Sequence, residues 1–208
     1  MIHYDYYSDI PDDRIDAFVR EQELGRLLTV ADDGQPHLGL YPFAYEGGAI
    51  EIHLNSADDQ FAHLAARPRC AFAVDEVLAT VPSYWVDPES AVAATAYHRT
   101  VLFECACEMI SRDPAVLAAQ QTRLLARYQP EGGFRPVAPD DPMYRGAIHH
   151  IAAVRLEVRA RRAKFKLAQN RPADVRARIA NELRKRGRPS DERAAEALVW
   201  TIEQEAKR

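Results

Sequence analysis

The stretch RLLTVADDGQPHLGLYPFAYEGGAIEIHL, residues 26–54, decides the fold. Two turn sequences, Asp32-Asp33-Gly34 and Gly47-Gly48, interrupt short runs rich in Leu, Ile, Val and Tyr. Strands are therefore predicted at 26–31, 35–43 and 49–54. Because only a short turn separates each strand from the next, we expect an antiparallel β-meander.

The segments on both sides extend this pattern into a mainly β protein of the α+β class. Further strands are predicted at 69–74, 100–110 and 151–167, helices at 11–25, 57–67, 114–128, 172–186 and 191–207, and a Gly- and Pro-rich loop at 129–142. Ser190 is expected to cap the last helix. Six short strands with few helices between them favour a small barrel over a doubly wound α/β sheet.

Length and composition indicate one main domain. The 208 residues are 47% hydrophobic, which is enough to bury a core. No stretch approaches the about 20 apolar residues of a membrane span, and the N-terminus MIHYDYYSDIP lacks the features of a secretory signal. The three cysteines, an odd number, predict buried reduced thiols rather than disulfides or a metal site. We therefore expect a cytoplasmic protein without membrane contact.

Charge is distributed unevenly around the net value of −4. Residues 155–188 hold thirteen Lys or Arg and three acids, whereas the rest of the chain holds 14 basic and 28 acidic residues. Such a basic segment either contacts a polyanion or pairs with the acidic remainder of the protein. Pairing is the preferred interpretation, since no recognisable helix-turn-helix supports sequence-specific DNA binding.

The residues suited to chemistry lie at predicted strand ends. No Gly-rich phosphate loop, His-Glu-x-x-His or Gly-x-Ser-x-Gly motif occurs, which argues against hydrolase and nucleotide-triphosphate chemistry. Aromatic, His, Asn and Gln residues instead gather in His53-Leu-Asn55-Ser56, Gln60-Phe61, Pro82-Ser83-Tyr84-Trp85, Tyr97-His98 and the segment 164–170. A flavin ring requires flat walls and a few hydrogen-bonding groups of this kind.

Structural roles fit several of these residues equally well. His53 is also typical of a hydrogen-bonded structural histidine, and Tyr84-Trp85 of core or interface packing. His149 and His150 are predicted on a strand, where adjacent side chains face opposite sides, and this argues against a shared metal or haem site.

In this order, the segments resemble the PaiB-like FMN-binding negative transcriptional regulators, within the pyridoxamine-phosphate-oxidase-like flavin split barrels. The resemblance runs from about Tyr4 to Arg186, and its most specific element is Lys166-Leu-Ala-Gln-Asn-Arg171. It implies a six-stranded antiparallel split β-barrel with flanking helices, a homodimer, and FMN held between the subunits. Residues 1–168 are then the FMN-binding domain and residues 169–208 a C-terminal helical extension.

The resemblance also implies the cofactor contacts. They are ten side chains: His53, Asn55, Ser56, Gln60, Ser83, Trp85, Tyr97, Lys166, Gln169 and Asn170. No catalytic side chain is assigned, because hydride transfer is the chemistry of the cofactor itself, and Tyr97 and His98 are expected to line the substrate side.

The chain departs from the family pattern at two places. Ser56-Ala-Asp58-Asp59-Gln60 stands where the family tends to have Arg-Ala-Asn-Pro-Gln, which replaces a cation and adds two acids beside the expected FMN phosphate. These carboxylates repel the phosphate unless Arg69, Arg99 or Lys166 compensates. The segment from Val92 to His98 also lacks a tryptophan and an asparagine of the family pattern, with Ala96 at one of the altered positions.

Three functions are consistent with the sequence. The first is an FMN-dependent oxidoreductase or flavin carrier, and the second is a ligand-responsive transcriptional regulator whose basic segment contacts nucleic acid. The third is a degenerate barrel that binds F420, haem or no cofactor. A homodimer is expected in addition, because the apolar run 101–107 is too long to be covered by one small sheet.

Overall fold

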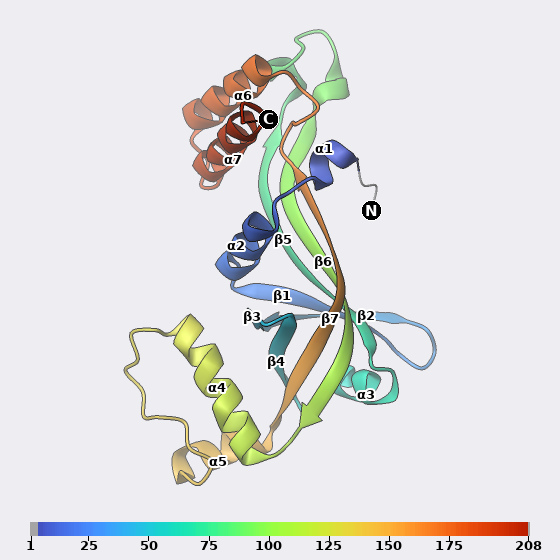
Figure 1. Cartoon of the computed structure of the whole chain (residues 1–208), viewed down its shortest axis with the longest axis vertical. Helices are drawn as coiled ribbons and strands as arrows, with labels where there is room; N and C mark the ends of the chain where they lie inside the picture. The colour runs from blue at the N-terminus through green and yellow to red at the C-terminus, as the bar shows by residue number, and fades with distance from the viewer. Residues whose placement is uncertain (1–3, 208) are drawn as a thin grey trace. The chain divides into compact units, whose positions relative to one another are not determined.

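The computed structural model describes residues 4–207 (Figure 1). Residues 1–3 of the N-terminal segment and residue 208 lie outside the described residues. The helices are α1 (Asp5–Ser8), α2 (Asp12–Glu21), α3 (Asp59–Ala66), α4 (Pro114–Tyr128), α5 (Pro142–His149), α6 (Ala173–Arg186) and α7 (Asp191–Glu205), with short 3-10 turns η1 (Ser83–Trp85) and η2 (Ala91–Ala93). The strands are β1 (Leu24–Val30), β2 (Pro36–Pro42), β3 (Ala44–Glu46), β4 (Ala49–Asn55), β5 (Arg69–Val81), β6 (Thr95–Ser111) and β7 (Ile151–Lys166).

The strands form a seven-stranded antiparallel sheet in the order β2-β1-β5-β6-β7-β4-β3. The mainly β, α+β class is confirmed, but the sheet has seven strands rather than six, because β3 forms before the turn at Gly47-Gly48. The predicted continuous meander is wrong, since β2 and β3 lie at opposite ends of the strand order. Pro42 ends β2, and the Phe43 N–H donates to the Tyr128 hydroxyl at 2.8 Å instead of to a neighbouring strand.

The connection before β7 differs from the sequence prediction. Residues 142–149 form helix α5, whose first amides are capped by the Asp141 carboxylate and whose first turn begins with Pro142. His149 ends this helix and His150 follows it, so the prediction of a strand at these histidines is wrong. Ser190 precedes α7 but its side chain makes no capping hydrogen bond.

The chain divides into two compact units. The larger unit consists of residues 16–74 and 102–162. Its core includes Ile50, Ile52 and Leu54, which alternate along β4 with Glu51, His53 and Asn55 on the opposite face. On that opposite face, the register places His53 beside Ala153 of β7, and Leu117 of α4 packs in the same cluster as Ala153. The face of β4 and β7 that bears His53 is therefore partly covered by α4.

The smaller unit consists of residues 4–15, 75–101 and 163–207. Helices α6 and α7 pack side by side in it, and both bury apolar faces (Figure 1). Their buried residues include Ile179, Ala180, Leu183, Ala194, Ala195 and Leu198. Gly187 ends α6 at φ +67°, a backbone conformation that favours glycine. No helix among the described residues is long and apolar enough to cross a membrane.

Candidate functional site

The ten predicted cofactor contacts occur in both units. His53, Asn55, Ser56 and Gln60 belong to the larger unit, and Ser83, Trp85, Tyr97, Lys166, Gln169 and Asn170 to the smaller one. Their local environments separate the groups that are free to bind a ligand from those already hydrogen-bonded within the chain.

His53 and Ser56 offer polar atoms that the chain itself does not use. Within residues 4–207, His53 Nδ1 and Ser56 Oγ are buried and have no hydrogen-bond partner. Burial lowers the pKa of His53, so its ring is neutral at pH 7 and presents one donor and one acceptor. Unsatisfied buried polar atoms are uncommon and often mark a site for a ligand or water. His53 lies on β4 and Ser56 directly follows it, and a ring nitrogen and a hydroxyl are the kinds of group that hydrogen-bond the polar edge of a flavin ring.

Gln60, by contrast, is fully engaged within the protein and only 3% exposed. Its amide nitrogen donates to the carbonyl of Leu27 at 3.1 Å and to the hydroxyl of Thr29 at 3.0 Å, and its oxygen accepts from the Tyr41 hydroxyl at 2.7 Å. A Cβ on Gly39 would lie 2.2 Å from this Gln60 oxygen, so glycine leaves the room that the amide occupies. The side chain thus ties α3 to β1 and β2.

The start of α3 is already capped by the chain itself. Asp58 accepts from the Gln60 N–H at 2.9 Å and from the Tyr41 hydroxyl at 2.7 Å. Burial and this hydrogen bond raise the pKa of Tyr41, which keeps its phenol protonated. Asn55 likewise accepts from the Ala57 N–H at 2.9 Å. A phosphate bound at this helix start would meet the Asp58 carboxylate, which carries a like charge and already occupies the Gln60 N–H.

In the smaller unit, Ser83 and Trp85 form the short turn η1, which is half-buried. The Arg186 guanidinium lies over the Trp85 ring with 5.0 Å to the ring centroid, and Arg178 Nε donates to the Trp85 carbonyl at 3.1 Å. Trp85 also lines two cavities, of about 420 and 310 Å³.

Residues 166–170 form the connection between β7 and α6. Gln169 donates to the Phe165 carbonyl at 2.6 Å and accepts from the Leu167 N–H at 2.8 Å, which holds Ala168 at φ +61°. Asn170 accepts from the Tyr7 hydroxyl at 3.1 Å. Both amides therefore stabilise the chain itself, and this is a role that the sequence pattern did not distinguish from cofactor binding.

Tyr97, His98 and Lys166 complete the predicted set. Tyr97 is buried, and burial raises its pKa to about 12. Burial, with a smaller effect of nearby Lys164, lowers the pKa of His98, whose Nδ1 lies 3.1 Å from the Thr100 hydroxyl. Lys166 Nζ donates to the Thr95 hydroxyl. At neutral pH the phenol and imidazole are therefore both uncharged.

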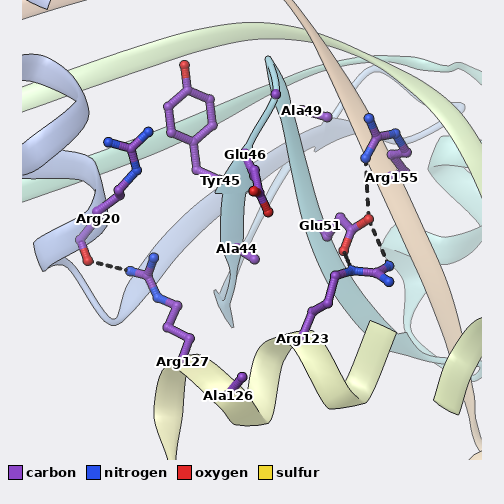
Figure 2. A pocket seen from close by; sticks show the side chains of 11 residues that line it. Arg20, Ala44, Tyr45, Glu46, Ala49, Glu51, Arg123, Ala126, Arg127 and Arg155 are labelled. Carbon is purple, nitrogen blue, oxygen red and sulfur yellow. Dashed lines mark hydrogen bonds and ion pairs between the residues drawn. The ribbon is translucent and has the colours of Figure 1, made fainter. Parts of the chain in front are cut away.

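The larger unit contains an arginine-lined cavity of about 790 Å³ (Figure 2). It was not predicted from the sequence. Its charged residues, Arg20, Glu46, Glu51, Arg123, Arg127 and Arg155, come from α2, β3, β4, α4 and β7. No local sequence pattern links them. Within residues 4–207, no cluster of three or more His, Cys, Asp or Glu is arranged to hold a metal ion.

The family model of pyridoxamine 5'-phosphate oxidase matches residues 11–157 of this chain. The chain belongs to this family. The match confirms the wider superfamily that the sequence resembles, whereas the PaiB-like subfamily stays a prediction. No curated protein matches the sequence significantly.

Several solved structures share the fold at low sequence identity. A conserved hypothetical protein from Mycobacterium tuberculosis is 22% identical, with 83% of this chain and 94% of that chain covered and a TM-score of 0.61. The flavocytochrome Anf3 from Azotobacter vinelandii is 18% identical, with 79% and 72% covered and a TM-score of 0.64. The FAD and heme binding protein from Mycobacterium smegmatis is 18% identical, with 75% and 71% covered and a TM-score of 0.61. At these identities the likeness concerns the fold.

Proposed function

We propose that this protein binds a flavin, FMN, and acts as a flavin-dependent oxidoreductase or flavin carrier. The observation that supports this most is the pair of unsatisfied buried atoms, His53 Nδ1 and Ser56 Oγ, in a chain of the pyridoxamine 5'-phosphate oxidase family. Two proteins of similar fold, the flavocytochrome and the FAD and heme binding protein, are named for flavin or haem cofactors. Haem is therefore the alternative cofactor that the test must distinguish.

The bound flavin would supply hydride or electron transfer. The chain's part is binding and orientation: His53, kept neutral by burial, and the Ser56 hydroxyl would hydrogen-bond polar atoms of the ring. No general acid or base is required of these residues. The phosphate is the group that fits least well, because Asp58 and Asp59 stand at the start of α3.

We expect FMN binding to tighten by about threefold to fivefold when Asp58 becomes Asn and Asp59 becomes Pro, because two like charges are removed near the phosphate. Asn can still cap the helix, and Pro is favoured at its first position, so α3 should form as before. Lys166→Ala should weaken binding by removing a cation. The measurement is the absorbance spectrum of the purified protein, followed by titration of FMN fluorescence.

Asp140→Asn is the matched control, since this exposed carboxylate lies in the same unit and outside α3. A Soret band without flavin bands in the wild-type spectrum would show that the protein binds haem and would contradict the FMN proposal. Unchanged FMN affinity in all variants would place the phosphate elsewhere in the protein.

The PaiB-like regulatory alternative is less well supported by the structure. The basic side chains of α6 have partners within the smaller unit: Arg178 with backbone carbonyls, Arg184 with Glu192, Lys185 with Glu182 and Arg186 with Asp191. These contacts favour a structural role for this part of the basic segment over phosphate contacts with nucleic acid.

We also propose a homodimer, with a second copy packed on the ribbon formed by β1 and β2. In the run 101–107 that suggested a dimer from the sequence, Phe103 and Cys105 are buried within the chain itself. The larger exposed apolar surface lies on the ribbon, where Leu38 is 59% and Leu40 is 54% exposed on the same face as Leu24 and Val30. Exposed large apolar side chains gathered on one face typically mark an interface, and Arg26, opposite Leu40, is the charged residue of β1 on this face.

Leu38→Asp combined with Leu40→Asp should shift the protein from dimer to monomer at micromolar concentration, because two charges would have to be buried at the interface. Light scattering coupled to size exclusion measures the mass. Val92→Asp is the control, since Val92 is exposed but lies away from the ribbon in sequence and in another unit. A monomeric wild type, or a dimer that survives both aspartates, would exclude this interface.

A further inference from the structure

The arginine-lined cavity of the larger unit has two sides with different charge balance (Figure 2). On one side, Glu51 accepts from Arg123 at 2.8 and 3.0 Å and from Arg155 at 3.3 Å. Arg155 also donates to Glu108 at 3.0 Å. Two arginines are thus matched by two carboxylates, and this side of the cavity has little net charge.

The other side is formed by Arg20 and Arg127. Arg127 donates to two backbone carbonyls, that of Arg20 at 2.9 Å and that of Gln22. Its guanidinium also lies over the rings of Phe43 at 4.9 Å and Tyr128 at 5.4 Å. These partners fix the guanidinium without neutralising it. Binding of a ligand would therefore cost little further conformational entropy of the Arg127 side chain.

Arg20 supplies a second positive charge without a matching acid. Its guanidinium makes no hydrogen bond or ion pair with any described residue, and its backbone carbonyl accepts from Arg127. Figure 2 shows Arg20 and Arg127 on the same side of the cavity. Glu46 is the one lining carboxylate that is not paired with an arginine among residues 4–207. The cavity therefore keeps a net positive charge on this side.

The remaining walls suit an organic ligand. Ala44, Ala49 and Ala126 leave space, and the Tyr45 ring, which packs against Phe103 with centroids 5.2 Å apart, gives a flat surface. A volume of about 790 Å³ is within the range of sites that hold nucleotide-sized molecules. Paired guanidiniums are well suited to phosphate oxygens, because they offer several N–H donors in a planar arrangement.

From these observations we propose that the cavity binds a small phosphomonoester, with the phosphate held by Arg20 and Arg127 and the organic part against Tyr45 and the alanines. This site lies within the larger unit and is separate from His53 and Ser56, which do not line it. The proposal is independent of the flavin proposal, since it concerns a ligand class recognised by other residues.

The test is isothermal titration of the full chain with adenosine 5'-monophosphate, adenosine and inorganic phosphate. The monophosphate should bind more tightly than either fragment, because it combines the charge and the ring. Arg20→Glu should weaken its binding at least tenfold, whereas Glu46→Gln should strengthen it. Arg145→Glu is the matched control: it makes the same charge change on an exposed arginine of the same unit that does not line the cavity. The control should leave the affinity unchanged.

Arg20→Glu is expected to fold, since the Arg20 guanidinium makes no hydrogen bond or ion pair within the described residues, and a thermal melt checks this. Equal affinity for adenosine and its monophosphate, or equal loss in the Arg20 and Arg145 variants, would overturn the proposal. Competition between the monophosphate and FMN would also overturn it, by placing both ligands in one site. Absence of FMN binding, with the monophosphate still bound, would refute the flavin proposal alone.

Discussion

Gln60→Leu is expected to lower the free energy of unfolding by about 3 kcal/mol, whether or not FMN is present. The leucine removes three hydrogen bonds of the amide, to the Leu27 carbonyl, the Thr29 hydroxyl and the Tyr41 hydroxyl. Thr29 keeps its contact with His63, and Tyr41 keeps its hydrogen bond to Asp58. Each lost hydrogen bond is worth about 0.5–1.5 kcal/mol, and the three together give the expected value. Equilibrium urea unfolding measures the difference.

The same measurement distinguishes a structural Gln60 from a cofactor contact. If Gln60 served mainly to bind FMN, the variant would lose flavin affinity while the cofactor-free protein kept its stability. Gln35→Leu provides the control, because Gln35 is exposed in the turn between β1 and β2 and its side chain has no partner in the described part of the chain. We expect the free energy of unfolding of that variant to lie within about 0.5 kcal/mol of the wild-type value. An equally small change for Gln60→Leu would contradict the structural role.

Local signals in the sequence predicted most elements of the fold. The Asp32-Asp33-Gly34 turn lies between β1 and β2, and the apolar alternation of 49–54 gave β4, because both patterns depend on neighbouring residues. Asp113 and Pro114 likewise marked the start of α4, where the Asp113 carboxylate accepts from the first amides of the helix.

Strand neighbours could not be predicted in the same way. Pairing between β4 and β7 joins residues 49–55 to residues 151–157, and no local pattern specifies such a distant partner. Where β2 and β3 separate, the Phe43 backbone is bound by the hydroxyl of Tyr128, a residue at the end of α4 and distant in sequence. The sequence pattern alone therefore predicted a continuous meander.

The candidate site shows a similar limit. Residue type identified polar side chains at strand ends, but hydrogen bonds to distant residues decide which of them are free. Gln60 is engaged by Leu27, Thr29 and Tyr41, and Asn170 by Tyr7. Only the structure separates these residues from His53 and Ser56, whose buried atoms have no partner among residues 4–207. The arginine-lined cavity could not be predicted from the sequence for the same reason, since the fold brings together residues that are distant along the chain.

Asp191→Asn is expected to lower the free energy of unfolding by about 2 kcal/mol at neutral pH. The Asp191 carboxylate is 1% exposed, accepts from Arg186 at 2.8 and 2.5 Å and from the Arg188 N–H at 2.8 Å, and so joins the end of α6 to the start of α7. An asparagine keeps the size of the side chain but leaves the Arg186 guanidinium without its counter-charge.

The pH dependence of the stability provides a second, independent test of this ion pair. The hydrogen bond from Arg186 holds the pKa of Asp191 below its ordinary value. A depressed folded-state pKa means that the stabilisation is fully present above the unfolded pKa of about 3.9 and is lost as the pH falls through the folded value. The difference between wild type and Asp191→Asn should therefore stay constant from about pH 8 to pH 5 and shrink below about pH 4.

Glu203→Gln is the matched control, because Glu203 is an exposed carboxylate on the same helix and has no partner within the described residues. Its removal should change stability by less than about 0.5 kcal/mol at every pH. Urea unfolding at several pH values gives both curves. A pH-independent difference for Asp191→Asn would mean that the loss comes from packing of the amide, and a difference below about 0.5 kcal/mol would mean that the Arg186 pair does not hold α6 and α7 together.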